Sequence, residues 1–175
     1  MNFCLILLAA GNSKRFQHKI PKPFMEVAGK TILELSLLKF KNIKQIKNII
    51  VVINKKHLKF IKKIKSKKLI KIIGGKTRQQ STLKALKYIK KRKLNCSNVL
   101  IHDSARPNIS SRLIRRIINK SKKNTVVPRI PVNDALKSLF SNNKLLSLTR
   151  ENFFLTQTPQ SYQYKNILNL HLNKK

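Results

Sequence analysis

Acidic residues are scarce in this sequence, and tryptophan is missing altogether. Only 5 of the 175 residues are Asp or Glu, against 40 Lys or Arg, so the formal net charge is +35. Such a surface attracts phosphate groups, which makes nucleic acids and phosphorylated small molecules the candidate partners. Lys, Ile and Asn are also the residues that an AT-rich coding sequence favours, so the charge alone identifies no function.

Cysteines are few, and long apolar runs are absent. Two cysteines, Cys4 and Cys96, exclude a disulfide-stabilised scaffold and fit a reducing, cytoplasmic compartment. No apolar run approaches the roughly 20 residues of a membrane span. The segment Met1–Ala10 is interpreted as a buried strand and not as a signal peptide, because no Lys or Arg precedes it. The length and the 41% of hydrophobic residues predict a single domain over residues 1–175.

Short apolar runs alternate with helical patterns along the chain. Strands are expected at Phe3–Ala10, Ile49–Ile53, Leu69–Ile73, Asn98–Ile101 and, more weakly, Thr125–Val127. Helices are expected after three capping positions, and a last helix is expected from Tyr164; the caps are Thr31 (with Glu34 in a capping box), Thr77, and Ser110 or Ser111. This alternation predicts an α/β fold with a mainly parallel sheet, helices on both faces and right-handed crossovers.

Residues 133–150 break this pattern. They contain few large apolar runs, and Asn142-Asn143 is a typical turn sequence. The segment is interpreted either as an arm that protrudes from the sheet or as an ordinary surface loop.

Two candidate phosphate-binding elements follow the first strand, at the end of a parallel strand where ligands bind. Ala9, Ala10 and Gly11 allow a close approach of the backbone, and Arg15 adds a positive charge. This loop matches neither the P-loop nor the dinucleotide-binding pattern. Lys22 lies between two prolines, which stiffen the backbone and fix the direction of its ammonium group.

Two later loops complete the expected edge of the sheet. Gly75 lets the backbone approach a base or sugar and Ser81 offers a hydrogen bond, although a plain strand–helix turn with Thr77 as the cap is the simpler interpretation and is favoured by the local sequence. Asp103 follows 68 residues without an acid, and its carboxylate is expected to bind a ribose hydroxyl, help hold Mg²⁺, or form a structural ion pair with Arg106. His102 is expected to pack beside its strand. No Ser–His–Asp arrangement or Cys/His metal spacing is visible.

Arg150 and Thr158 are further phosphate-binding candidates. Either side chain could clasp a phosphate, in its own subunit or in a neighbour. The alternative for Arg150 is a surface pair near Glu151.

Taken together, these blocks resemble the 2-C-methyl-D-erythritol 4-phosphate cytidylyltransferase family of the non-mevalonate isoprenoid pathway. The matching segments, in the family's order, are LAAGNSKRF, IPKPF, IGGKTRQQS, IHDSARP, PVNDALK, LTREN and TQTPQSY. The resemblance implies a Rossmann-like nucleotidyltransferase fold and a homodimer formed through exchanged arms. It also implies cytidylyl transfer from CTP to methylerythritol phosphate, with Mg²⁺ and release of pyrophosphate.

The resemblance also assigns roles by position. Arg15 and Lys22 match the residues that stabilise charge at the transferring phosphate. The positions that match nucleotide-binding residues are Ala9, Ala10, Gly11, Gly75, Ser81, Asp103 and Ser104. The positions that match binding residues for the sugar phosphate are Arg150, Thr158 and Arg106. Asp103 is in addition the candidate ligand for Mg²⁺.

The sequence departs from the family in several places. Ser13 replaces a usual glycine, Pro23 replaces a common glutamine, and Ala135 stands where the family has a threonine that contacts the substrate. Family members continue beyond this length and carry a further lysine that positions methylerythritol phosphate. A C-terminal portion is therefore expected to be missing, as in a fragment, a part of a fusion with a downstream pathway enzyme, or a decaying copy, and a sheet edge would then be exposed.

Three other functions remain open. A related cytidylyltransferase would use an alditol phosphate such as ribitol 5-phosphate, and an inactive remnant would only bind nucleotide. A basic nucleic-acid-binding protein is supported by Lys55–Lys93, which carries 17 Lys or Arg and no acid. Phe60 and Tyr88 are the only aromatic residues in that segment, which disfavours base stacking and so a nucleic-acid partner.

Overall fold

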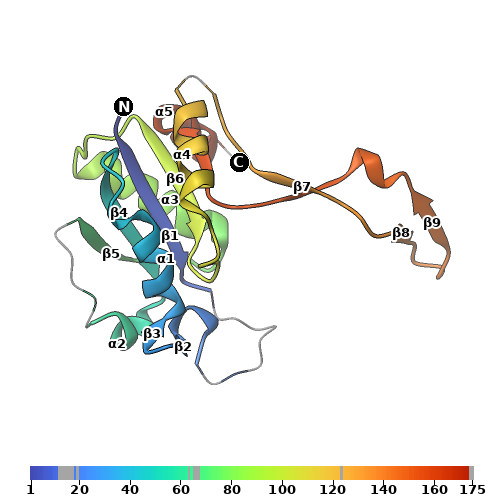
Figure 1. The fold of residues 1–175 in the computed structure, drawn as a ribbon, viewed down its shortest axis with the longest axis horizontal. Helices are drawn as coiled ribbons and strands as arrows, with labels where there is room; N and C mark the ends of the chain where they lie inside the picture. The colour runs from blue at the N-terminus through green and yellow to red at the C-terminus, as the bar shows by residue number, and fades with distance from the viewer. Residues whose placement is uncertain (12–17, 19, 63, 65–67, 123, 174–175) are drawn as a thin grey trace.

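The main sheet has five strands, in the order β11-β6-β1-β4-β5 (Figure 1). The computed structural model describes all residues except 12–17, 19, 63, 65–67, 123 and 174–175. The strands of the sheet are β1 (Phe3–Ala9), β4 (Ile46–Ile53), β5 (Leu69–Ile73), β6 (Asn98–Asp103) and β11 (Gln160–Gln163). The first four run parallel, and β11 pairs with β6 in the antiparallel sense. The expected α/β fold with a mainly parallel sheet is confirmed.

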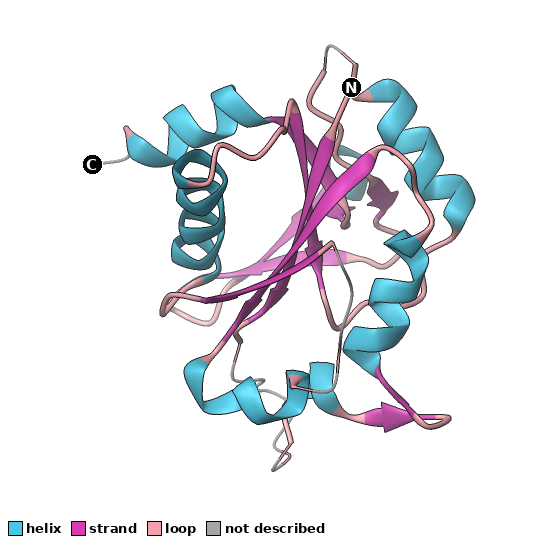
Figure 2. Cartoon of the chain, turned by 90° about the vertical axis from the view of Figure 1, so that its left-hand side faces the viewer, coloured by secondary structure: helices cyan, strands magenta, loops and turns pink. Residues whose placement is uncertain are grey.

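Helices cover both faces of this sheet (Figure 2). The long helices are α1 (Ile32–Lys41), α3 (Arg78–Lys91), α4 (Ser111–Lys120) and α5 (Tyr164–Leu172). Side chains of α1 and α4 join one buried apolar cluster, and side chains of α3 and α5 join another. The short elements near the first loop are η2 (Lys22–Phe24), β2 (Glu26–Val27), β3 (Lys30–Thr31), η3 (Lys55–His57) and α2 (Leu58–Ile61).

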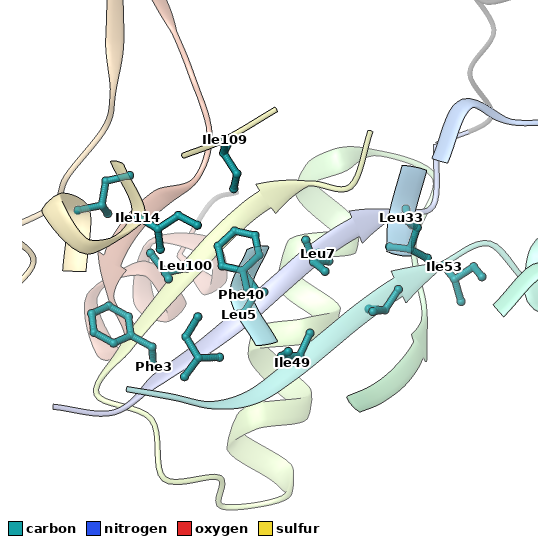
Figure 3. Close-up of a cluster of buried hydrophobic side chains, with 14 of the residues drawn as sticks. Phe3, Leu5, Leu7, Leu33, Phe40, Ile49, Ile53, Leu100, Ile109 and Ile114 are labelled. Atoms are coloured by element: carbon teal, nitrogen blue, oxygen red, sulfur yellow. The ribbon is translucent and has the colours of Figure 1, made fainter. Parts of the chain in front are cut away.

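Strand β1 contributes to both apolar clusters because side chains alternate across a strand. Phe3, Leu5 and Leu7 face the cluster that contains Phe40 of α1 (Figure 3), and Ile6 faces the cluster beneath α3. All five side chains are fully buried. The continuous apolar run that predicted the first strand is therefore the run of a strand covered on both faces.

Capping hydrogen bonds confirm the predicted starts of α1, α3 and α4. Thr31 Oγ1 accepts from the Glu34 amide at 3.2 Å, and Glu34 Oε2 accepts from the Thr31 amide at 2.8 Å, which makes a complete capping box. Thr77 Oγ1 caps α3 through the Gln80 amide at 3.1 Å. Of the two serines proposed for α4, Ser110 is the cap.

The predicted strand at Thr125–Val127 is wrong. Val126 forms an isolated bridge to Ser161, and the fifth strand of the sheet is β11. β11 has the sequence QSYQ, which lacks the apolar run by which the other strands were predicted. β11 pairs along its length with β6 and meets Val126 on its other side through one bridge, so it needs fewer apolar side chains than a central strand.

Between α4 and β11 the chain forms an arm, residues 129–156, that extends away from the sheet (Figure 1). Its elements are β7 (Arg129–Pro131), β8 (Leu136–Leu139), β9 (Leu145–Leu148), η4 (Arg150–Asn152) and β10 (Phe154–Thr156). β7 pairs with β10 at the base, and β8 pairs with β9 in a hairpin at the tip. The arm is longer than the predicted 133–150 because the β7–β10 pairing lies outside those limits.

Candidate active site

A cleft of about 640 Å³ opens at the carboxyl ends of the parallel strands. Seven residues that the sequence singled out line it: Ala9, Ala10, Gly11, Lys22, Gly75, Ser81 and Asp103. They come from the end of β1 and the residues directly after it, from η2, from the loop after β5, from the first turn of α3 and from the end of β6. The sheet therefore brings together residues that are nearly a hundred positions apart in the sequence, as expected for an open parallel sheet.

Lys22 is placed at the cleft by the residues that follow it. Pro23 lies in the first turn of η2, where a missing N–H is tolerated. Phe24 is buried and stacks on the ring of Phe60, with the ring centroids 5.1 Å apart. The short helix is thus anchored by an aromatic contact on its inner side, which fixes where the backbone of Lys22 lies at the cleft wall.

The turn from Gly74 to Ser81 forms another wall of the cleft and is held by its own hydrogen bonds. Ser81 Oγ accepts from the Gly75 amide at 3.1 Å, and Gln80 Oε1 accepts from the Lys76 amide at 2.8 Å. Lys84 Nζ donates to the Gly74 carbonyl at 2.8 Å. Thr77 caps α3, as expected for a plain strand–helix turn. Gly75 and Ser81 nevertheless also line the cleft.

Gly74 has no room for a side chain. A Cβ there would lie 2.6 Å from the Cβ of Ala10 and 2.9 Å from Ser81 Oγ. We expect Gly74→Ala to lower the free energy of unfolding by about 1–3 kcal/mol, as overpacking does. Chemical denaturation measures this change. Gly11→Ala is the matched control, because no described atom lies within 4 Å of a Cβ at Gly11. Equal stability of the two variants would contradict this close packing.

Asp103 is the carboxylate of the cleft wall, and two arginines pair with it. Its Oδ1 lies 3.4 Å from Arg78 Nε, and its Oδ2 lies 3.4 Å from Arg106 Nε. The carboxylate side chain is 32% exposed, so solvent screens both pairs and each contributes little to stability. The pairs instead fix the direction of three side chains at the mouth of the cleft. The pair with Arg106 was one of the alternatives expected from the sequence, whereas the pair with Arg78, which opens α3 at the same edge, was not expected.

His102 is fully buried directly before Asp103, as expected for a residue that packs beside its strand. Burial lowers the pKa of His102 to about 4, because the charged imidazolium would lose its hydration. The ring packs against Phe40, with the centroids 5.3 Å apart. His102 is therefore neutral at physiological pH.

The other candidate residues that the structure describes are not among those that line the cleft. Ser104 is buried, and its hydroxyl donates to the Leu8 carbonyl at 2.7 Å. Thr158 is 6% exposed and hydrogen-bonds to His102. Arg106 also donates to Gln157 of the neighbouring loop. Arg15 lies outside the described residues.

Arg150 lies on the arm and is not among the residues that line the cleft of its own chain. Its Nε lies 3.1 Å from Glu151 Oε1, and its Nη1 donates to the Asn133 carbonyl at 2.6 Å. The surface pair near Glu151, which the sequence left open, is thus present.

The described residues form neither a metal cluster nor a membrane-spanning helix. Within the described part of the chain, no three His, Cys, Asp or Glu side chains gather in a way that could hold a metal ion. No described helix has the length and apolar character needed to span a bilayer.

Comparison with known sequences identifies relatives over nearly the whole chain. The family model described as IspD, 2-C-methyl-D-erythritol 4-phosphate cytidylyltransferase, matches residues 3–175. A bifunctional IspD/IspF enzyme of Pelagibacter ubique is 46% identical over 175 residues, which cover 99% of this chain and 46% of that protein. A 2-C-methyl-D-erythritol 4-phosphate cytidylyltransferase of Thermosipho melanesiensis is 39% identical over 171 residues, which cover 94% of this chain and 74% of that protein.

Solved structures show the same fold. The bifunctional IspDF of Campylobacter jejuni has a TM-score of 0.82 at 30% identity, over 99% of this chain and 44% of that one. The 4-diphosphocytidyl-2C-methyl-D-erythritol synthase of Anaerococcus prevotii has a TM-score of 0.80 at 27% identity, over 98% of this chain and 74% of that one. The fold and the cleft thus define an α/β nucleotidyltransferase. The chain belongs to the 2-C-methyl-D-erythritol 4-phosphate cytidylyltransferase family and spans less than half the length of its bifunctional members.

Proposed function

We propose that this chain transfers a cytidylyl group from CTP to 2-C-methyl-D-erythritol 4-phosphate. A phosphate oxygen of the acceptor attacks the α-phosphorus of CTP, the bond between the α-phosphorus and the bridging oxygen breaks, and pyrophosphate leaves with that oxygen. The observation that carries the proposal is the convergence of Lys22, Gly75, Ser81 and Asp103 on one cleft at the carboxyl ends of the sheet.

Fixed positive charge is the main requirement of this reaction. An acceptor phosphate is largely ionised at neutral pH, so the attacking oxygen needs little help from a general base. The obstacle is the repulsion between two polyanions, which preorganised cations relieve without reorganising water. Lys22 on the anchored η2 helix is proposed to supply such a charge, and Arg15 of the loop after β1 is proposed to supply another.

The remaining cleft residues are proposed to hold the nucleotide. Ala9, Ala10 and Gly11 leave the backbone after β1 open to the phosphates, because their side chains are small. Gly75 and Ser81 shape the wall for the base, and Asp103 faces the ribose. The Ser104 hydroxyl holds the end of β1 in place through its hydrogen bond to the Leu8 carbonyl. Arg106 orients the Asp103 carboxylate through their ion pair.

Mg²⁺ is proposed to enter with the nucleotide. Mg²⁺ in nucleotide sites is held by one or two carboxylates together with phosphate oxygens and water. Asp103 provides one carboxylate at the cleft, although both of its oxygens also face arginines. The residues therefore fit an ion held mainly by phosphates, where it would neutralise charge on the triphosphate.

A homodimer formed through the arm is a further part of the proposal. Apolar side chains of the arm stand largely in solvent: Ile130, Leu139, Phe140, Leu145, Leu146, Phe153, Phe154 and Leu155 are all 43–67% exposed. A soluble chain rarely leaves such a surface uncovered. A second copy would cover it and bring Arg150 towards the neighbouring cleft, where its guanidinium could bind the acceptor phosphate.

We expect Leu145→Glu in the arm to shift the chain from dimer to monomer. Leu145 is 65% exposed in the single chain, so a charge there costs the monomer little but is expensive inside an interface. Sedimentation at micromolar concentration measures the change. Lys120→Glu, on an exposed position of α4, is the control and should remain dimeric. A wild-type chain that sediments as a monomer would contradict the dimer.

The bifunctional relatives support an association with a second enzyme of the same pathway. Those of Pelagibacter ubique and Campylobacter jejuni carry this domain within a longer chain. A cytoplasmic location is proposed because Cys4 and Cys96 are both free thiols, which fit a reducing compartment.

Pyrophosphate release tests the proposed reaction. The chain is incubated with CTP, Mg²⁺ and either methylerythritol phosphate or ribitol 5-phosphate. Release with methylerythritol phosphate alone is expected. Release with ribitol 5-phosphate would favour the alditol phosphate reaction. No release with either acceptor, together with salt-sensitive binding of generic RNA or DNA, would favour a nucleic-acid-binding protein.

A further inference from the structure

His102 and Thr158 form a buried pair behind the cleft. His102 is 0% exposed and Thr158 is 6% exposed. Thr158 Oγ1 lies 2.8 Å from His102 Nδ1, and His102 Nε2 lies 3.0 Å from the carbonyl oxygen of Arg106. The pair joins the end of β6 to the loop that leads into β11, two segments 56 residues apart in the sequence.

The partners determine the direction of each hydrogen bond. The carbonyl of Arg106 can only accept, so His102 Nε2 must carry the proton. In a neutral imidazole Nδ1 is then an acceptor, and the Thr158 hydroxyl must donate to it. The lone pairs of Thr158 Oγ1 stay available for the Asp103 amide, which lies at 3.4 Å. A single chain of donors thus runs from the Asp103 amide through Thr158 and His102 to Arg106.

This chain of hydrogen bonds closes the turn Asp103–Arg106 from its buried side. Within the turn the Arg106 amide donates to the Asp103 carbonyl at 3.0 Å. On its outer side the Asp103 carboxylate pairs with Arg78 and Arg106 at the cleft. The His102 ring rests against Phe40 of α1, so the core also limits its rotation. The backbone that carries the Asp103 carboxylate is therefore held in part by two side chains that do not line the cleft.

We propose that His102 and Thr158 are positioning residues that hold the Asp103–Arg106 turn in its nucleotide-binding shape. In this proposal Thr158 acts through the buried chain of hydrogen bonds, whereas the family resemblance implied a role in binding the acceptor phosphate. The proposal rests on the proposed function, because it takes the cleft to be the CTP site.

Calorimetric titration of the whole chain with CTP tests the proposal. Thr158→Val keeps the shape of the side chain but removes both the donor and the acceptor. We expect it to weaken CTP binding about tenfold, and Thr158→Ser to restore binding to within about twofold of wild type. Ser161→Ala is the matched control, since Ser161 is also buried but its hydroxyl has no hydrogen-bond partner among the described residues. Its CTP affinity should equal that of wild type.

The tautomer of His102 supplies a second measurement that does not need CTP. In ¹⁵N-edited spectra of the side chains, the signals of His102 are identified as those that disappear in His102→Gln. In the wild-type chain these signals should show a proton on Nε2 and none on Nδ1. The Nδ1 shift should change in Thr158→Val. If Thr158→Val does not fold, the tautomer and the Thr158→Ser affinity decide the question.

The possible failures are distinguishable. A wild-type chain that binds no CTP contradicts the proposed function. Normal CTP binding by folded Thr158→Val, or a proton on Nδ1 of His102, contradicts the positioning role alone. A Thr158→Val that binds CTP normally but loses affinity for methylerythritol phosphate would instead show direct contact with the acceptor.

Discussion

Lys22→Ala is expected to lower kcat/KM for CTP by about 10²-fold or more, the cost of losing a preorganised group that stabilises transition-state charge. Lys22 lines the cleft in which the two polyanions are proposed to meet, and no water molecule can replace a fixed charge there without reorganisation. The fold should survive, because η2 is anchored by Phe24 against Phe60. Pyrophosphate release with Mg²⁺ and methylerythritol phosphate gives the rate, and thermal unfolding gives the stability.

A control variant distinguishes the loss of a positive charge at the cleft from a small decrease in the overall charge of the molecule. Lys120→Ala removes the same charge from the exposed last turn of α4. It should retain full activity, since the long-range field of 40 basic residues hardly changes. Equal losses in both variants, or full activity in Lys22→Ala, would remove Lys22 from the site.

Arg150→Ala is expected to lower kcat/KM for the acceptor by at least about tenfold, because a charged hydrogen bond to a phosphate is lost. The affinity for CTP should stay unchanged, because Arg150 is proposed to contact the acceptor phosphate in the neighbouring cleft and not the nucleotide. The separate measurement of CTP binding and acceptor kinetics distinguishes this result from general unfolding. An equal loss of CTP affinity would argue against an acceptor-specific role.

Mixing equal amounts of two impaired variants tests whether Arg150 acts across the dimer. When Lys22→Ala and Arg150→Ala chains are unfolded and refolded together, half of the dimers carry one variant of each kind. If Arg150 serves the partner's cleft, each mixed dimer has one cleft with both residues intact, and about a quarter of wild-type activity returns. If Arg150 serves its own cleft, every cleft lacks one residue, and the activity of the mixture stays at the mean of the two variants assayed separately.

The fold could be predicted from the sequence wherever apolar periodicity was strong. The runs around Leu5, Val51 and Leu100 are buried on both faces, so each central strand was visible without its neighbours. Strand β11 was missed because an edge strand with the sequence QSYQ carries no such run. Its place depends on pairing with β6, which is a long-range contact that local sequence does not encode.

The candidate site was predictable in its loops but not in its internal contacts. Lys22 and Asp103 stood out, one by its flanking prolines and the other as an isolated acid. Arg78 was missed because one more basic residue in so basic a chain gives no signal. The His102–Thr158 pair was missed because it joins two segments whose approach is set by the antiparallel pairing of β11 with β6.

Titration of the ¹⁵N-labelled chain with CTP, observed through its amide signals, tests most directly whether the cleft at the strand ends is the nucleotide site. We predict that the largest shifts fall on Gly11, Gly75, Ser81 and Asp103, and that the amides of α4 stay in place. Shifts spread over the lysine-rich outer face of α3, with the cleft amides unchanged, would contradict the account.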